Sequence, residues 1–321
     1  MSVTYIVGAG GIGCAVGYAM LQTPGPLVFV EVDKAKLQYG QLNGIQVDNR
    51  KPLAAEFVHF DDWQPQPGDR VYLTTKCYDN AAVLAKLPED VDLIPIQNGY
   101  DTQLEDNGHP TEGIASFVAR CVPHTTRTHI TRPGQLHFGG RGNSWGVLQD
   151  YSSWSISNLF EVIDVHDIRP IKATKLMYNA AISPIAAAAG LDNGALLSEP
   201  KAQKLFFDLI QENYRILTAA NIPLGKVGPF HPRTVSKILQ QRWLAKLMAK
   251  KFERSLRGTY CSMAGEIEQG RTELDNYTGH LLRLAGDTIS APINRRVYEV
   301  VSRMTRERIP PHRGVIDELS S

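Results

Sequence analysis

The sequence predicts an α/β protein in which an N-terminal doubly wound parallel sheet is followed by an all-helical C-terminal domain. Three observations predict it. Short apolar runs alternate with helical stretches in the first half, a glycine-rich turn follows the first run, and long amphipathic helices fill the second half. The 321 residues are enough for two domains.

Short runs rich in β-branched residues predict parallel strands that are buried on both faces. These runs, separated by helical stretches at 11–21, 34–42 and 80–87, are residues 3–8, 27–32, 70–75 and 92–97. From about residue 115 the pattern changes, and Gly- and Pro-bearing turns indicate antiparallel strands. The segments concerned are "IASFVARCV", "THITRPGQLHFGG" and "SWGVLQ".

The remainder of the chain is expected to be almost wholly helical. Amphipathic patterns between short Gly, Pro and Asn turns predict helices at 199–219, 232–256, 274–285 and 291–306. We place the domain boundary near Arg169 and Pro170, which gives domains of residues 1–169 and 170–321.

Composition narrows the class of function. The formal net charge of +1 gives no electrostatic reason to expect a nucleic acid or a membrane as partner. No apolar run is long enough to span a bilayer, and the first residues resemble no signal peptide. The four cysteines lack CxxC spacing and the nine histidines are dispersed, so we expect no metal site and a reducing, cytoplasmic location.

A glycine turn follows the first predicted strand. In "IVGAGGIGCA", Gly8, Gly10 and Gly13 have the G-x-G-x-x-G spacing, and Gly11 and Ile12 begin the next helix. Glycine allows the tight turn, the approach of a diphosphate to the backbone, and close packing of helix on strand. The helix N-terminus then attracts the phosphates. The pattern indicates a Rossmann-type dinucleotide site, against the alternatives of a purely structural turn or a methyltransferase.

Glu31 ends the second predicted strand, where a carboxylate can accept hydrogen bonds from the adenosine ribose hydroxyls. A ribose phosphate would meet like charge there, so Glu31 favours NAD over NADP. NADP stays open, because Glu31 could be solvated, Asp33 could simply cap the next helix, and Lys34 and Lys36 could bind a phosphate.

Two polar residues follow the later strands, at the sheet edge where ligands bind in open parallel sheets. Lys76 lies in "TTKCYD" and Asn98 in "IQNGYD". A solvated lysine and an ordinary Asn-Gly turn are the alternatives.

The helix predicted from "KATKLMYNAAISPIAAAAG" is rich in alanine, yet it carries a polar face. Lys172, Lys175, Asn179 and Ser183 recur at steps of three or four residues. Burying such groups without partners costs roughly 2–7 kcal/mol each, so this face should meet something polar.

These motifs, with "CSMAGEIEQGRTELDNYTGHLLRLA", resemble in order the ketopantoate reductase family, and the resemblance extends over nearly the whole chain. It implies a Rossmann domain, here 1–169, for the dinucleotide and a helical domain, 170–321, for the substrate. The long amphipathic helices of this second domain could also bury a face against a second copy of the chain, which predicts dimerisation. The resemblance further implies an active site between the two domains. Family members use NADPH to reduce ketopantoate to pantoate, a step towards pantothenate.

The resemblance assigns roles residue by residue. Lys175 matches the catalytic lysine and Asn179 the asparagine of the K-L-x-x-N motif. Lys76 and Asn98 match residues that line the nicotinamide and substrate side of the cleft. We expect Lys175 to donate the proton to the oxygen of the carbonyl that is reduced, which is typically worth about 10²–10⁴-fold in rate.

Two further residues match the substrate pocket: Ser262 the serine that binds the substrate carboxylate, and Glu273 its acidic residue. Both could instead be helix caps. The family commonly has Asn in place of Ser183 and Asn-Gly in place of Thr278-Gly279, and a basic residue near Glu31.

We therefore expect an NAD(P)H-dependent 2-oxo acid reductase that acts on ketopantoate and forms a homodimer. One alternative is an NAD-linked dehydrogenase of another branched or aromatic 2-hydroxy acid. Another, of a different class, is a non-catalytic dinucleotide sensor.

Overall fold

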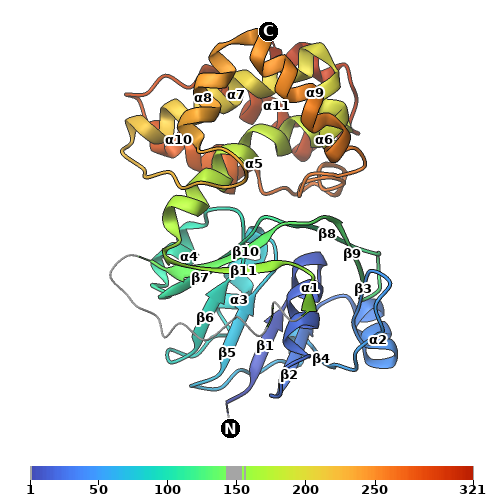
Figure 1. The fold of residues 1–321 in the computed structure, drawn as a ribbon. Helices are drawn as coiled ribbons and strands as arrows, with labels where there is room; N and C mark the ends of the chain where they lie inside the picture. Colours follow the sequence, from blue (N-terminus) through green and yellow to red (C-terminus); the bar gives the residue numbers. More distant parts are fainter. Residues whose placement is uncertain (1, 142–153, 155–156, 321) are drawn as a thin grey trace. The chain divides into compact units, whose positions relative to one another are not determined.

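The protein, described here by a computed structural model covering residues 2–141, 154 and 157–320, divides into two compact units (Figure 1). The first contains Met1–Gln97 and Asp101–Ile168. The second contains Arg169–Ser321 together with the short segment Asn98–Tyr100. None of the described helices combines the length and apolar character that a membrane span requires.

The first unit is built on a parallel sheet with the strand order β4-β2-β1-β5-β6. The four predicted parallel strands are confirmed, and β4 adds an edge strand that the sequence analysis did not predict. The strands are β1 (Thr4–Val7), β2 (Leu27–Glu31), β4 (Glu56–His59), β5 (Arg70–Leu73) and β6 (Asp92–Pro95).

Both faces of this sheet are buried, as the near-continuous apolar runs predicted. Alternate residues point to opposite faces, so Ile6 and Phe29 join one core cluster and Val7 and Val30 the other. Residues of α1 lie in the first cluster, and residues of α3 and α4 lie in the second. The helices are α1 (Gly11–Met20), α2 (Lys34–Asn43), α3 (Asn80–Leu84) and α4 (Thr102–Asp106).

Two three-stranded sheets complete the first unit. Their orders are β11-β10-β7 and β3-β9-β8. The strands are β3 (Gln46–Val47), β7 (Thr111–Ala115), β8 (Val118–Cys121), β9 (Arg127–Arg132), β10 (Gln135–Gly140) and β11 (Glu161–Asp167).

The expected antiparallel pairing holds for β7 with β10 and for β8 with β9. The structure adds β11, which was not among the predicted strands and runs parallel to β10. A long connection separates these two strands in the sequence, and parallel neighbours need such a crossover. The predicted strand "SWGVLQ" lies outside the described residues.

The second unit is helical, as predicted, and its core cluster draws on α5, α6, α7, α11 and α12. Alanines of α5 face this core with almost no exposed surface, which lets neighbouring helices approach closely (Figure 1). The helices are α5 (Arg169–Ala189), α6 (Asn193–Ser198), α7 (Pro200–Ala219), α8 (Pro232–Gln240), α9 (Arg242–Leu256), α10 (His280–Ala285), α11 (Pro292–Glu307) and α12 (Val315–Ser320).

One predicted helix, 232–256, is wrong as a single element because Gln241 has an extended backbone that separates α8 from α9. The two helices pack on different neighbours, α8 on α7 and α9 on α6. Ser236 of α8 exchanges hydrogen bonds with Gln211 of α7, at 2.8 and 2.6 Å. A single straight helix over 232–256 would not turn between α7 and α6 as α8 and α9 do.

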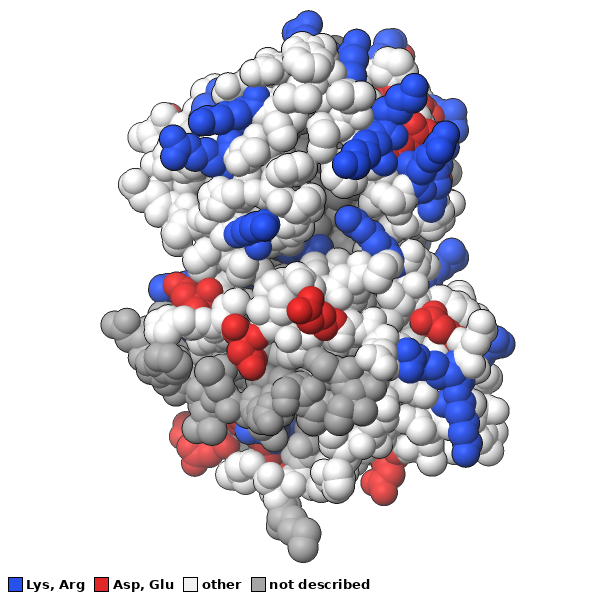
Figure 2. Space-filling view, viewed as in Figure 1, with Lys and Arg blue, Asp and Glu red and all other residues white. Residues whose placement is uncertain are grey.

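Basic residues gather on one part of the helical unit. Residues 226–257 contain nine Lys and Arg residues and a single acidic residue, Glu253. All nine basic residues are exposed. Figure 2 shows Lys and Arg side chains spread over the helical unit, whereas most acidic side chains in view belong to the first unit. The near-neutral charge of the chain therefore conceals a strongly basic segment.

A buried acidic residue caps α11 from a neighbouring helix. Glu212 of α7 is 4% exposed, and its carboxylate accepts hydrogen bonds from the backbone of Asn294 at 2.8 Å and Ile293 at 3.3 Å. Asn294 donates to Asn213 as well, at 2.8 Å, and Asn213 donates to the carbonyl of Met177 in α5 at 3.0 Å. This network holds α5, α7 and α11 together.

Replacing Glu212 by Gln should lower the free energy of unfolding by about 1–3 kcal/mol, because the amide nitrogen would face backbone N–H groups that now donate to the carboxylate. Urea unfolding measures the change. The control is Glu299→Gln, an exposed position on α11 that should change stability by less than about 0.5 kcal/mol. Equal effects of both substitutions would contradict the capping role of Glu212.

Candidate active site

The glycine turn between β1 and α1 has the close geometry that its spacing predicted. Gly8 has a φ of +98°, which L-residues with a side chain rarely adopt. A Cβ on Gly13 would lie 2.0 Å from the carbonyl oxygen of Gly8, so only glycine lets the helix approach the strand this closely. The hydroxyl of Thr74 donates to that same oxygen at 2.7 Å and ties the turn to the end of β5.

Gly10 and Gly11 have different surroundings. A Cβ on Gly10 would meet nothing within 4 Å, and Gly10 is the N-cap of α1 without a side-chain hydrogen bond. A Cβ on Gly11 would lie 2.4 Å from the carbonyl oxygen of Ala119, so β8 passes directly against the start of the helix. Open space beside Gly10 and a free helix N-terminus fit an anionic diphosphate. Ile12 follows within the first turn of α1.

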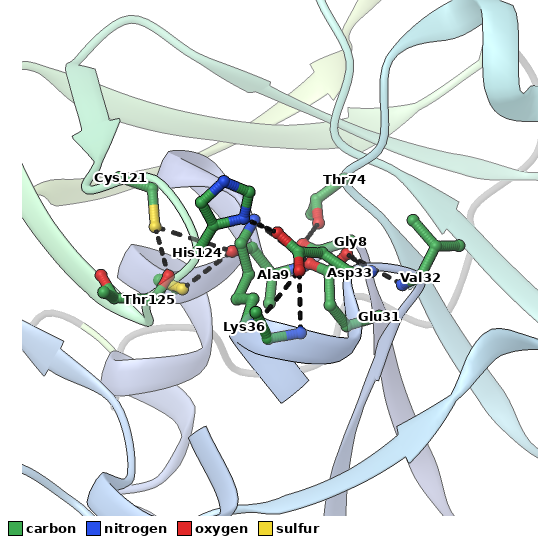
Figure 3. A network of polar contacts seen from close by, with 12 residues as sticks. Gly8, Ala9, Glu31, Val32, Asp33, Lys36, Thr74, Cys121, His124 and Thr125 are labelled. Carbon is green, nitrogen blue, oxygen red and sulfur yellow. Dashed lines mark hydrogen bonds and ion pairs between the residues drawn. The ribbon is translucent and has the colours of Figure 1, made fainter. Parts of the chain in front are cut away.

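Glu31 ends β2 beside this turn and is 6% exposed. One carboxylate oxygen accepts from the backbone of Val32 at 2.8 Å and Asp33 at 3.0 Å. The other accepts from the backbone of Ala9 at 3.1 Å and pairs with the ammonium of Lys36 at 3.3 Å (Figure 3). The carboxylate thus braces the glycine turn, a role that the sequence did not reveal. Asp33 caps α2, as the alternative reading expected.

The two polar residues after the later strands lie in different units. Lys76 belongs to the first unit, at the N-cap of a short 3-10 turn, Cys77–Asp79. Asn98 belongs to the second unit, since the backbone N–H of Tyr100 donates to the carbonyl of Asn276 and the Asn276 amide donates back, both at 3.0 Å. The side-chain oxygen of Asn98 is buried and has no hydrogen-bond partner among the described residues.

The polar face of α5 is present in the structure. Lys172 and Ser183 are 3% and 1% exposed, and Lys175 and Asn179, one turn apart between them, are partly buried. The ammonium of Lys172 lies 4.5 Å from the ring centre of Tyr100, a cation–π contact that stabilises a buried charge. Lys175 and Asn179 are therefore the more accessible members of this face.

Tyr100 also stacks on His280 of α10, with ring centres 4.3 Å apart. Burial lowers the pKa of His280 to about 4, and the charges of Arg283 and Lys172 lower it further in the same direction. His280 is therefore neutral at pH 7, and it places an uncharged ring against Tyr100. Neither ring was expected from the sequence, because nothing local marks them.

Ser262 and Glu273, matched from the resemblance, are joined by a residue that was not predicted. The Tyr277 hydroxyl lies 3.2 Å from the Ser262 hydroxyl and donates to the Glu273 carboxylate at 3.3 Å. Tyr277 and Glu273 are 0% and 4% exposed. A π-helical turn, Asp275–Gly279, follows Glu273. It includes Thr278, whose buried hydroxyl has no partner among the described residues. Such turns are frequent at functional sites.

Within the described part of the chain, no group of three or more His, Cys, Asp or Glu side chains could hold a metal ion. Of the residues predicted for the site, the second unit contains Asn98, Lys175, Asn179, Ser183, Ser262 and Glu273, and the first unit contains the glycine turn, Glu31 and Lys76.

Comparison with known families accounts for both units. Residues 4–150 match the family model "Ketopantoate reductase PanE/ApbA", and residues 167–305 match its C-terminal counterpart. The chain belongs to the ketopantoate reductase family. The membership and the fold class predicted from the sequence are confirmed.

Individual relatives are distant. A 2-dehydropantoate 2-reductase of Archaeoglobus fulgidus is 24% identical over 310 residues, which cover 92% of this chain and 95% of the relative. One of Pyrobaculum aerophilum is 26% identical over 200 residues, 59% of this chain and 66% of the relative. The fold is similar to a D-mandelate dehydrogenase solved with NADH and anilino(oxo)acetate, with a TM-score of 0.74, 15% identity and coverage of 99% of this chain and 100% of that chain.

The neutral His280 predicts a pH dependence of stability. Its pKa in the folded protein is about 4, below the ordinary value of 6.5, so the unfolded state binds more protons between these values. The stability contribution is complete above pH 6.5 and is lost as the pH falls towards 4, by up to about 1.4 kcal/mol per pH unit. His280→Phe keeps a ring on Tyr100 and should flatten this slope in urea unfolding.

The exposed His312 provides the control, and His312→Gln should keep the wild-type slope. A His280→Phe variant with an unchanged slope from pH 4 to 6.5 would show that His280 titrates normally in the folded protein.

Proposed function

We propose that this protein reduces the 2-oxo group of ketopantoate to the hydroxyl of pantoate, with a nicotinamide dinucleotide as hydride donor. The observation that carries the proposal is the family match, which spans both units and includes every motif on which the roles depend. The relatives named 2-dehydropantoate 2-reductase support the same substrate. We assign dinucleotide binding to the predicted domain of residues 1–169 and substrate binding to the predicted domain of residues 170–321.

The glycine turn supports the assignment of the first unit. When bound, a reduced nicotinamide supplies the hydride that the carbonyl carbon accepts. The open space beside Gly10 and the N-terminus of α1 would hold the diphosphate. Lys76 and Asn98 would line the nicotinamide side, and the buried side-chain oxygen of Asn98 is an acceptor without a partner among the described residues.

Lys175 is the residue to which we assign proton donation. As hydride reaches carbon, negative charge develops on the carbonyl oxygen, and a positioned ammonium both stabilises that charge and neutralises it by protonation. Asn179 lies one turn along α5 and can hold the same oxygen or the amine. Ser262 would bind the substrate carboxylate, and Glu273, held by Tyr277, would supply an acceptor in the pocket.

Oxidation of NADH and NADPH, followed by absorbance with a panel of 2-oxo acids, tests the proposal. Ketopantoate should give the highest kcat/KM. A higher value with an aromatic 2-oxo acid would favour the alternative dehydrogenase, which the similarity in fold to D-mandelate dehydrogenase keeps in view. No oxidation with any acid would favour the dinucleotide sensor. The homodimer expected from the amphipathic helices stays a prediction.

Lys175→Ala should lower kcat by about 10²–10⁴-fold and leave the dissociation constant of the dinucleotide nearly unchanged. Lys175→Arg separates charge from proton donation, since a guanidinium keeps its proton at every working pH, and it should be nearly as slow. Lys201→Ala, at an exposed position on α7, is the control and should keep wild-type turnover. Wild-type turnover by Lys175→Ala would remove Lys175 from the mechanism.

We further propose a preference for NADH over NADPH, because a ribose phosphate would meet the buried carboxylate of Glu31. Dissociation constants from nucleotide fluorescence should show NADH bound more tightly. Glu31→Gln removes the charge and releases Lys36, so the preference should shift towards NADPH by about tenfold or more. Tighter binding of NADPH by the wild-type protein would contradict this proposal.

A further inference from the structure

Two of the four cysteines meet beside the glycine turn. Cys14 lies in α1 and is 0% exposed, and Cys121 ends β8 and is partly exposed. Both sulfur atoms contact one backbone oxygen, that of Ala9, at 3.2 Å for Cys14 and 3.9 Å for Cys121. Each thiol also shifts the pKa of the other. Figure 3 shows Cys121 directed from its strand towards Ala9.

The pair is chemically asymmetric. The neighbouring thiol of Cys14 and the nearby charge of Lys36 lower the pKa of Cys121 to about 7, against the opposing effects of burial and Glu31. The neighbouring Cys121 and burial raise the pKa of Cys14 well above its ordinary value. The single S–H of Cys121 can donate to one of the carbonyl oxygens of Val122 and Thr125, which lie 3.6 and 3.0 Å from the sulfur. Cys121 is thus the more acidic and more accessible thiol, and Cys14 lies behind it.

We propose that Cys14 and Cys121 form a redox-active pair that closes to a disulfide between α1 and β8 under mild oxidation. With hydrogen peroxide as oxidant, the Cys121 thiolate attacks one oxygen, the O–O bond breaks, and hydroxide leaves as water after taking a proton. Cys14 then attacks the sulfenic sulfur of Cys121, its proton goes to the departing oxygen, and a second water leaves. Two thiols lose two electrons in total, and a dithiol reductant reverses the reaction.

Formation of the disulfide would alter the glycine turn, on which the proposed dinucleotide binding depends. A disulfide has no S–H group, so the Ala9 carbonyl would lose the thiol donors that now face it. The N–H of that same residue donates to Glu31. There is no slack on the strand side, because β8 already lies against Gly11. We therefore expect the oxidised protein to bind NADH at least about tenfold more weakly. This consequence rests on the proposed function, whereas disulfide formation does not.

Intact mass and peptide mapping after peroxide treatment test the pair directly. The wild-type protein should lose about 2 Da, the peptides of Cys14 and Cys121 should be linked, and dithiothreitol should restore the original mass. Cys14→Ser should stop at the sulfenic acid, which dimedone traps on Cys121. Cys121→Ser should resist the same treatment. The control is a double variant, Cys77→Ser with Cys261→Ser, which retains only the proposed pair and should still lose about 2 Da.

The NADH dissociation constant is then measured before and after oxidation. Weaker binding that dithiothreitol reverses supports the proposal. Four free thiols after treatment, or a link to Cys77 or Cys261, would overturn it, and a disulfide without any change in affinity would overturn its effect on the turn. If the reduced protein binds neither NADH nor NADPH, the proposed function fails, and the mass measurement still decides whether the pair forms.

Discussion

A polar group that leaves water must find a partner inside the protein, and this constraint organises both units. Glu31 is buried at the end of β2, and it is satisfied by the backbone of the glycine turn and by Lys36. Glu212 is buried between helices, and it is satisfied by the start of α11. In each case an acidic side chain fixes the position of a backbone segment that hydrophobic packing alone would leave free to slide. Buried carboxylates therefore hold the glycine turn in the first unit and the start of α11 in the second.

The same constraint distinguishes two neighbouring amide side chains, Gln97 and Asn98. Gln97 exchanges hydrogen bonds with Asn80 at 2.8 and 3.1 Å and binds the carbonyl of Thr75 at 2.9 Å, so it serves the strand ends. Its neighbour Asn98 has a buried oxygen without a partner among the described residues. Two adjacent amides thus differ in their hydrogen bonds. An unsatisfied acceptor of this kind costs stability, which binding of a donor group would recover.

The sequence predicted those parts of the structure that depend on residues adjacent to one another in the chain. The β1 strand, Gly8 and Gly13 were predictable, because strand, turn and helix are adjacent and glycine is required by close approach. The contact that places Asn98 with the helical unit joins Tyr100 and Asn276, which are 176 residues apart, and no local signal marks it. Tyr277 could have been suspected, since it lies four residues after Glu273, yet its link to Ser262 depends on tertiary packing.

The net charge of the whole chain does not describe the charge of each of its surfaces. A net charge of +1 describes the whole chain, and from it we expected no anionic macromolecule as partner. A ligand or partner, however, meets one surface at a time, and fields between exposed charges are screened within about 10 Å at moderate salt. Nine exposed basic residues between 226 and 257 act at that range, and acidic residues of the first unit in Figure 2 compensate them only in the total. The effect of charge on binding is therefore set by the surface that a ligand approaches. At α8 and α9 that surface is basic.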